Sequence, residues 1–212
     1  LCGYLASFAY VKAGIHPFLS ILIAIPAFFA IGYALQRVVI NRIIAAPVLL
    51  TLTLTFGLDL MLSNGMILAF TADFKKLVLD PPLGTIAFGA VVLPIDRLAA
   101  MLLALALTGM LYLILSRSRI GRAIVAVRMD REAAALMGVD VKRIYAATFG
   151  LGAMMAGASG PLLVMIFPIS PLTSTAYLGK AFVVCVLGGL GSVSGALAGG
   201  ILLALIEGIG ST

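Results

Sequence analysis

The sequence predicts an all-α, polytopic transmembrane helix bundle. Of its 212 residues, 63% are hydrophobic and only 10% are charged, and the mean hydropathy is +1.22, whereas a soluble domain is roughly half apolar and a quarter charged. The apolar runs reach about 20 residues, enough to cross a bilayer, and they lack the two-residue alternation of membrane strands. Because backbone groups in lipid must bond internally, we predict that these runs are helices.

The runs divide the chain into about six to seven membrane segments, which we assign to one transmembrane domain over residues 1–212. Residues 1–11 resemble the end of a helix and do not begin with Met, so we expect a fragment of a longer protein. The last segment, 181–206, is uncharged but contains a glycine-rich break, which predicts one broken or re-entrant segment. The segments between them cover residues 17–36, 45–70, 97–116 and 144–167.

Two basic stretches predict the orientation of the bundle. Residues 117–143 hold seven basic and three acidic residues, and the shorter stretch 37–44 holds Arg37 and Arg42. Because Lys and Arg accumulate on the cytoplasmic side of membrane proteins, both stretches are predicted to be cytoplasmic loops. The intervening segments place residues 71–94 on the opposite side, as an external excursion that could include a short hairpin.

Several function classes are excluded by residue types. The net charge of +6 does not indicate nucleic acid, because the basic residues lie between apolar runs and the chain has no Trp for base stacking. Cys2 and Cys185 lie in apolar runs without a Cys or His partner nearby, and they are predicted to be small buried side chains. The single histidine, His16, cannot form a metal site or a triad alone, so no metal site is predicted.

The basic stretch 117–143 contains the signals of a short helix. Asp130 is a suitable N-cap for a helix that begins at Arg131, and Glu132 in the first turn favours the helix dipole. Gly138 can end this helix in the left-handed conformation, and Asp140 can cap the next one. A helix of about two turns is unstable alone in water. We therefore expect it either to pack on the ends of its own bundle or to fit a groove of another protein.

The segment Glu132-Ala133-Ala134-xxx-Gly138 resembles the EAA-xxx-G motif of ABC importer permeases. Both GRAIVAVRMDREAAALMGVDVKRI and AFVVCVLGGLGSVSGALAGGILLALIEG resemble the branched-chain amino-acid permeases of the LivH type. The Ile-x-Leu-Pro that follows the motif in many importers is absent after Gly138, as is common in that branch. The resemblance implies that 117–143 is the ATPase-docking loop and that its coupling residues are Arg128, Asp130, Arg131, Glu132, Ala133, Ala134 and Gly138.

The resemblance also implies a location, a substrate and partners. The chain would lie in a bacterial inner membrane and carry branched-chain amino acids, with other amino acids, urea or short amides left open. Two ATPase subunits would dock inside and a substrate-binding protein outside. A second permease subunit would complete the pathway, in a heteromeric pair or by self-pairing. ATP and Mg²⁺ would be bound by the partners, since this chain has no GxxxxGK[ST] loop; no cofactor and no enzymatic activity are expected.

A polar stripe marks one candidate pathway. Thr51, Thr55, Asp59 and Ser63 recur every four residues and share one helix face, with Asn64 beside them. An acidic side chain at mid-span costs about 2.5–3.5 kcal/mol on the insertion scale, so this face is predicted to point to the bundle interior or the solute path. Alternatively, the hydroxyls bond their own helix carbonyls and Asp59 only contacts a neighbouring helix.

The glycine-rich break is the second candidate for the pathway, through Gly188, Gly189, Gly191 and Ser192. Broken helices are tolerated where they line a cavity or are buried in protein. The spacing Gly191-xxx-Gly195-xxx-Gly199 also allows another helix to approach closely. The break is therefore either a re-entrant element near the path or a site of tight helix packing.

Two other function classes fit the sequence less well. An ion-coupled secondary carrier or a solute channel would have no use for a docking helix, and a carrier usually needs more intramembrane carboxylates than Asp59. A membrane-embedded enzyme would need a nucleophile–base pair or a metal constellation within its spans, and none is present in the sequence. A transporter subunit without catalysis is therefore the prediction.

Overall fold

The chain is described from a computed structural model that covers residues 2–5, 17–43, 48–70, 85–88, 91–170, 174–189 and 191–210. His16 and the first part of the predicted external excursion lie outside these ranges. The helices are α2 (Pro17–Val38), η1 (Ile40–Arg42), α3 (Val48–Phe70), α4 (Ile95–Arg117), α5 (Arg119–Met129), α6 (Arg131–Leu136), α7 (Val141–Ile166), α8 (Ser174–Gly188) and α9 (Val193–Gly210).

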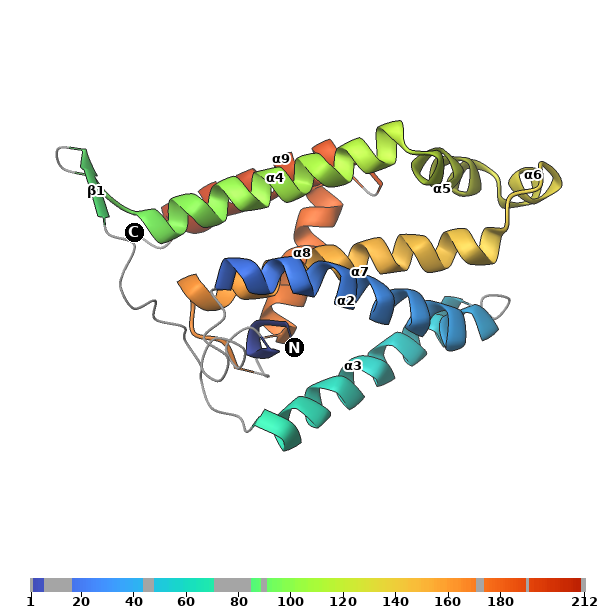
Figure 1. Ribbon diagram of the computed structural model, residues 1–212, viewed down its shortest axis with the longest axis horizontal. Helices are drawn as coiled ribbons and strands as arrows, with labels where there is room; N and C mark the ends of the chain where they lie inside the picture. Colours follow the sequence, from blue (N-terminus) through green and yellow to red (C-terminus); the bar gives the residue numbers. More distant parts are fainter. Residues whose placement is uncertain are drawn as a thin grey trace.

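This architecture confirms the predicted all-α bundle (Figure 1). In the described part of the chain, four helices are long and apolar enough to cross a membrane: Ser20–Arg42, Arg97–Arg117, Val141–Ile166 and Val193–Gly210. Thr53–Ala69 and Ala176–Gly188 are shorter apolar helices. The stretch 71–94, predicted to be external, contains a hairpin in which β1 (Thr85–Phe88) pairs antiparallel with β2 (Val91–Pro94).

The core of the bundle is the long antiparallel contact between α2 and α7, which lie side by side (Figure 1). Small residues on α7 let the two backbones approach, as is typical of membrane helices. A Cβ atom added to Gly157 would lie 2.6 Å from Cγ of Phe28, and one on Gly150 would lie 3.1 Å from the Phe29 carbonyl oxygen. Where α4 meets this pair, Ala158 is fully buried.

The other helices are arranged around this core. Helix α9 runs back along α4, and α8 leads into α9 across the bundle, while α3 diverges from the end of α2 (Figure 1). Among the described elements, α3 has no extensive packing interface. Cys2 is buried as predicted, but the same prediction is wrong for Cys185, which is exposed. The reason is that α8 packs extensively only against α9, so most of its surface has no described neighbour.

The basic stretch differs most from expectation because it holds two helices rather than one. Helix α5 was not predicted, although Ser118 caps it by accepting a hydrogen bond from the Gly121 amide at 2.9 Å. Gly121 fits closely under the end of α4, since an added Cβ would lie 2.6 Å from the Ile114 carbonyl oxygen. The Ser118 cap and the apolar spacing of Ile120, Ile124 and Val127 were the signals available in the sequence.

Candidate functional site

Helix α6 has the capping predicted from the sequence. The Asp130 carboxylate accepts hydrogen bonds from the amides of Glu132 and Ala133, at 2.9 and 3.0 Å. Gly138 has a φ of +83°, the left-handed conformation that ends the helix. Asp140 then caps α7 by accepting from the Arg143 amide at 3.1 Å. These local contacts confirm where the short helix begins and ends.

The surface of α6 is divided between an anchored and an open part. Ala134 is buried, and the helix contacts α5 and the start of α7. Leu136 and Met137 are 89% and 85% exposed, and Figure 1 shows α6 at the far end of the molecule, beyond the ends of the long helices. The bundle therefore holds α6 in place but leaves its largest apolar side chains uncovered.

Replacing Asp130 with Ala should loosen α6 without unfolding the bundle. Loss of an N-cap costs ~1 kcal/mol of helix stability, which corresponds to roughly fivefold faster opening. Hydrogen–deuterium exchange of the Glu132 and Ala133 amides in the full-length protein measures this. Asp130→Asn retains a capping acceptor and should exchange like the wild type. Equal protection in the Ala and Asn variants would show that the cap contributes nothing.

The glycine-rich break is a turn between two helices at the end of the bundle where α5 lies. Each of the four predicted residues has a local role there. Gly189 and Gly191 have φ values of +81° and +93°, and Ser192 caps α9 by accepting from the Gly195 amide at 3.0 Å. Gly188 packs against Gly195 of α9. Because α8 has 15 residues, it is about 22 Å long and shorter than a full span.

The structure brings the two predicted sets of site residues together at one contact. Nη1 of Arg128, in the last turn of α5, donates a hydrogen bond to the Gly191 carbonyl oxygen at 2.9 Å. A Cβ atom on Gly191 would lie 2.6 Å from Nη2 of the same guanidinium, so a side chain at this position would displace Arg128 from its present place. Arg128, which lies two residues before the α6 cap Asp130, thus contacts the turn between α8 and α9.

The opposite ends of α8 and α9 are also linked. Nζ of Lys180 in α8 lies 2.8 Å from Oε1 of Glu207 in α9, and both side chains are about half exposed. Glu207 is therefore paired across the two helices. Together with the glycine contact at the turn, this ion pair joins α8 and α9 into one hairpin.

The polar stripe of α3 does not join this arrangement. Asp59 is exposed, and α3 lacks an extensive interface with other described elements. Asn64 donates to the Leu60 carbonyl of its own helix at 2.8 Å, as the local alternative predicts. Thr55 and Ser63 are partly buried, and the side chain of Thr51 lies outside the described residues. The role of this stripe in a solute path stays a prediction.

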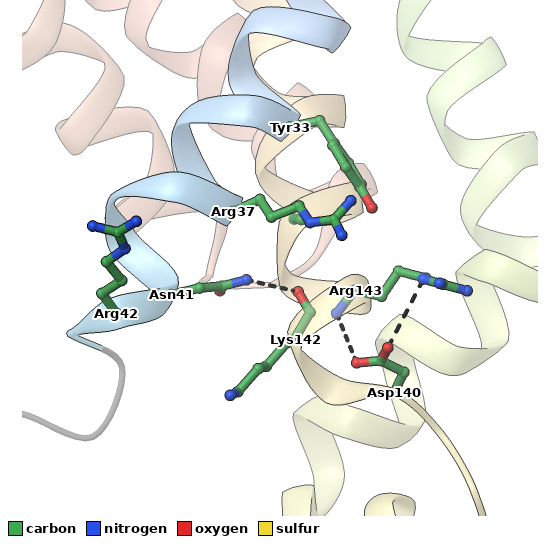
Figure 2. A pocket seen from close by; sticks show the side chains of 8 residues that line it. Tyr33, Arg37, Asn41, Arg42, Asp140, Lys142 and Arg143 are labelled. Atoms are coloured by element: carbon green, nitrogen blue, oxygen red, sulfur yellow. Dashed lines mark hydrogen bonds and ion pairs between the residues drawn. The ribbon is translucent and has the colours of Figure 1, made fainter.

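The two predicted cytoplasmic loops lie at one end of the bundle, where they form a polar pocket. Asn41 of η1 donates to the Lys142 carbonyl oxygen at the start of α7, at 3.2 Å. Around this contact is a cavity of about 530 Å³, shown in Figure 2. It is lined by Tyr33, Arg37, Asn41, Arg42, Asp140, Lys142, Arg143 and Ala146.

Comparison with known proteins assigns the family. The model of a family described as "Branched-chain amino acid transport system / permease component" matches residues 1–212. The chain is 32% identical over 188 residues to the high-affinity branched-chain amino acid transport system permease protein BraD of Pseudomonas aeruginosa, covering 86% of this chain and 61% of the relative. No solved structure matches it.

Two further relatives have similar names. The chain is 41% identical over 95 residues to the permease protein LivH of Escherichia coli K12, which covers 44% of this chain and 31% of LivH. It is 28% identical over 209 residues to the probable LivH of Methanocaldococcus jannaschii, covering 92% and 63%. The chain thus spans less than two thirds of each of these relatives. It belongs to the family of permease components of branched-chain amino acid transport systems.

Proposed function

We propose that this chain forms the transmembrane permease core of an ABC importer that passes branched-chain amino acids, or related small polar solutes, across the bacterial inner membrane. The observation that carries the proposal is the form of α6. It is capped by Asp130, anchored through Ala134, and exposes Leu136 and Met137 beyond the ends of the spans. An apolar surface held outside the bilayer calls for a protein partner.

The partner proposed for α6 is an ATPase subunit with an apolar groove. A short amphipathic helix that lays its apolar side chains into a groove is a recurrent mode of recognition. Burying Leu136 and Met137 would contribute about 1.5–3 kcal/mol each. ATP hydrolysis is assigned to that partner, and this chain would supply the pathway, with a second permease subunit beside it and a substrate-binding protein outside.

The substrate assignment is supported by the relatives, whose names include branched-chain amino acid transport. The permease wall has only to pass the solute, because an external binding protein can select it. The alternative of an ion-coupled carrier or a channel is not favoured by the family match, and neither would require a docking helix.

The route from the ATPase to the membrane is proposed to pass through Arg128. This residue lies between α6 and the α8–α9 turn, and its guanidinium holds the Gly191 carbonyl oxygen. A displacement of α6 would therefore move the inner end of the hairpin directly. Gly188, Gly189, Gly191 and Ser192 act in this proposal as the receiving element of the coupling contact.

Docking can be tested with the full-length permease, co-expressed with the ATPase subunits of its own transport system. We expect Leu136→Ser/Met137→Ser to lose co-purifying ATPase by at least about tenfold, because two buried apolar contacts are removed. The matched control is Ile120→Ser/Val125→Ser, which changes two half-exposed apolar residues of α5. The control should retain the ATPase.

Reconstitution in proteoliposomes then tests transport. The wild-type complex should take up branched-chain amino acids only with ATP and the binding protein. Retention of the ATPase by the α6 variant would contradict the docking assignment. Uptake that proceeds without ATP, driven by an ion gradient or by the solute gradient alone, would instead support the carrier or the channel.

A further inference from the structure

The pocket between η1 and α7 is strongly basic. Four cationic side chains line it, Arg37, Arg42, Lys142 and Arg143, against the single carboxylate of Asp140. That carboxylate is already engaged in capping α7, and its ion pair with Arg143 is loose, at 3.8 Å between Nε and Oδ2. The lining therefore carries a net charge of +3, from four cationic side chains and one carboxylate.

The depth of the pocket places it at the membrane interface. One candidate span, Ser20–Arg42, ends in the pocket, and another, Val141–Ile166, begins there. Helix α7 has 26 residues, about 39 Å at 1.5 Å per residue, which exceeds a hydrocarbon core of ~30 Å by roughly two turns. Because Lys142 and Arg143 lie in its first turn, this is the end of α7 that is expected to reach the lipid headgroups. Tyr33, on the membrane side of the pocket, is a residue type that favours this level.

Figure 2 shows the arrangement of these side chains. Arg37 extends from α2 beneath Tyr33, and Arg143 is turned toward Asp140, while Arg42 lies on the far side of Asn41 and the Lys142 side chain extends below it. The Asn41–Lys142 bond fixes the two elements to each other at the centre. The cations therefore surround the junction of two spans. An ordinary row of solvated charges would instead follow one face of a single helix.

We propose that this pocket binds the phosphate-bearing headgroup of an anionic phospholipid from the inner leaflet. Guanidinium groups suit phosphate because they donate two parallel hydrogen bonds, and a Lys adds a point charge. Basic pockets between membrane helices on the cytoplasmic side recognise such headgroups. The cavity of about 530 Å³ is large enough for a headgroup. An acidic segment of a partner protein is less suited, since the pocket lies at headgroup depth and not at the protruding α6.

The bound lipid would brace the junction from which the docking loop returns to the membrane. Asp140 and Arg143 form the first turn after α6, and Arg37 belongs to the opposing span. A phosphate held between the two spans would offset the repulsion among their cations. The inference concerns the membrane around the protein and does not depend on which solute is transported.

The test uses the full-length permease, delipidated in mild detergent and then titrated with dioleoyl-phosphatidylglycerol. Native mass spectrometry counts the bound lipid. We expect Arg37→Gln/Lys142→Gln to weaken binding roughly twenty-five-fold, at roughly fivefold for each cation removed near an anionic group. Arg119→Gln/Arg122→Gln removes two cations of α5 outside the pocket and should bind like the wild type. Arg37→Lys/Lys142→Arg keeps the charge and should also retain the lipid, which separates lost binding from lost folding.

Four results would overturn the proposal. The two neutralised pairs could weaken lipid binding equally, which would indicate surface charge in general. Dioleoyl-phosphatidylcholine could bind as well as the anionic lipid. Inorganic phosphate could displace the lipid at the same concentration as the lipid headgroup, which would assign the site to a free anion. Finally, assembly with the ATPase subunits could expel the lipid from the wild-type pocket, which would assign the cations to that protein partner.

Discussion

Replacing Gly195 with Leu should abolish accumulation of the folded permease. Gly195 packs against the Gly188 carbonyl group of α8, so a Cβ atom there would overlap backbone rather than a movable side chain. Gly199, one turn further on, also has no room, since its Cβ would lie 2.9 Å from the Val184 carbonyl oxygen. Overpacking a well-fitted contact costs about 1–3 kcal/mol or more. Because the backbone itself obstructs the side chain here, we expect the upper end of this range.

The matched control is Gly200→Leu on the same helix. An added Cβ at Gly200 meets nothing within 4 Å, so this variant should be produced and remain monodisperse like the wild type. Gly195→Ala should be intermediate. Size-exclusion chromatography and thermal unfolding of the full-length protein measure the series. If Gly195→Leu folds as well as Gly200→Leu but alters transport, the glycines line the pathway instead of packing the hairpin.

Replacing Arg128 with Ala should separate ATP hydrolysis from transport. The variant loses the hydrogen bond to the Gly191 carbonyl oxygen, while the apolar side chains of α6 that are proposed to bind the ATPase are unchanged. We therefore expect ATP hydrolysis to persist and uptake per ATP to fall about tenfold, within the usual range of coupling energies between sites. The measurement is the ratio of solute uptake to phosphate release in proteoliposomes containing the complete transporter.

Arg119→Ala is the control for this experiment. Arg119 is an exposed arginine at the opposite end of α5, so its loss removes the same charge without touching the α8–α9 turn. Its uptake per ATP should match the wild type. Arg128→Lys should be partly impaired, because an ammonium can reach a carbonyl but lacks the guanidinium fork. If uptake and hydrolysis fall together in Arg128→Ala, the residue supports ATPase docking and does not transmit its motion.

The α8–α9 hairpin is suited to pass on such a motion as one body. Its two helices are joined near the turn by the contacts among Gly188, Gly195 and Gly199, and further along by the Lys180–Glu207 ion pair. A close-packed interface transmits displacement because it has few alternative arrangements. A displacement of Gly191 would therefore move the far end of α9 by a similar distance. The proposed coupling route depends on this rigidity.

The sequence by itself determined most of the long apolar helices, both ends of α6 and the common side of the two basic loops, but not α5 or the start of α8 at Ser174. These features depend on local interactions: the Asp130 cap bonds amides two and three residues away, and the Gly138 conformation needs no distant partner. Only the tertiary structure decided that Arg128 meets Gly191, 63 residues away, and that Asn41 meets Lys142, 101 residues away. No periodicity encodes such pairs, because they depend on how the helices pack against one another.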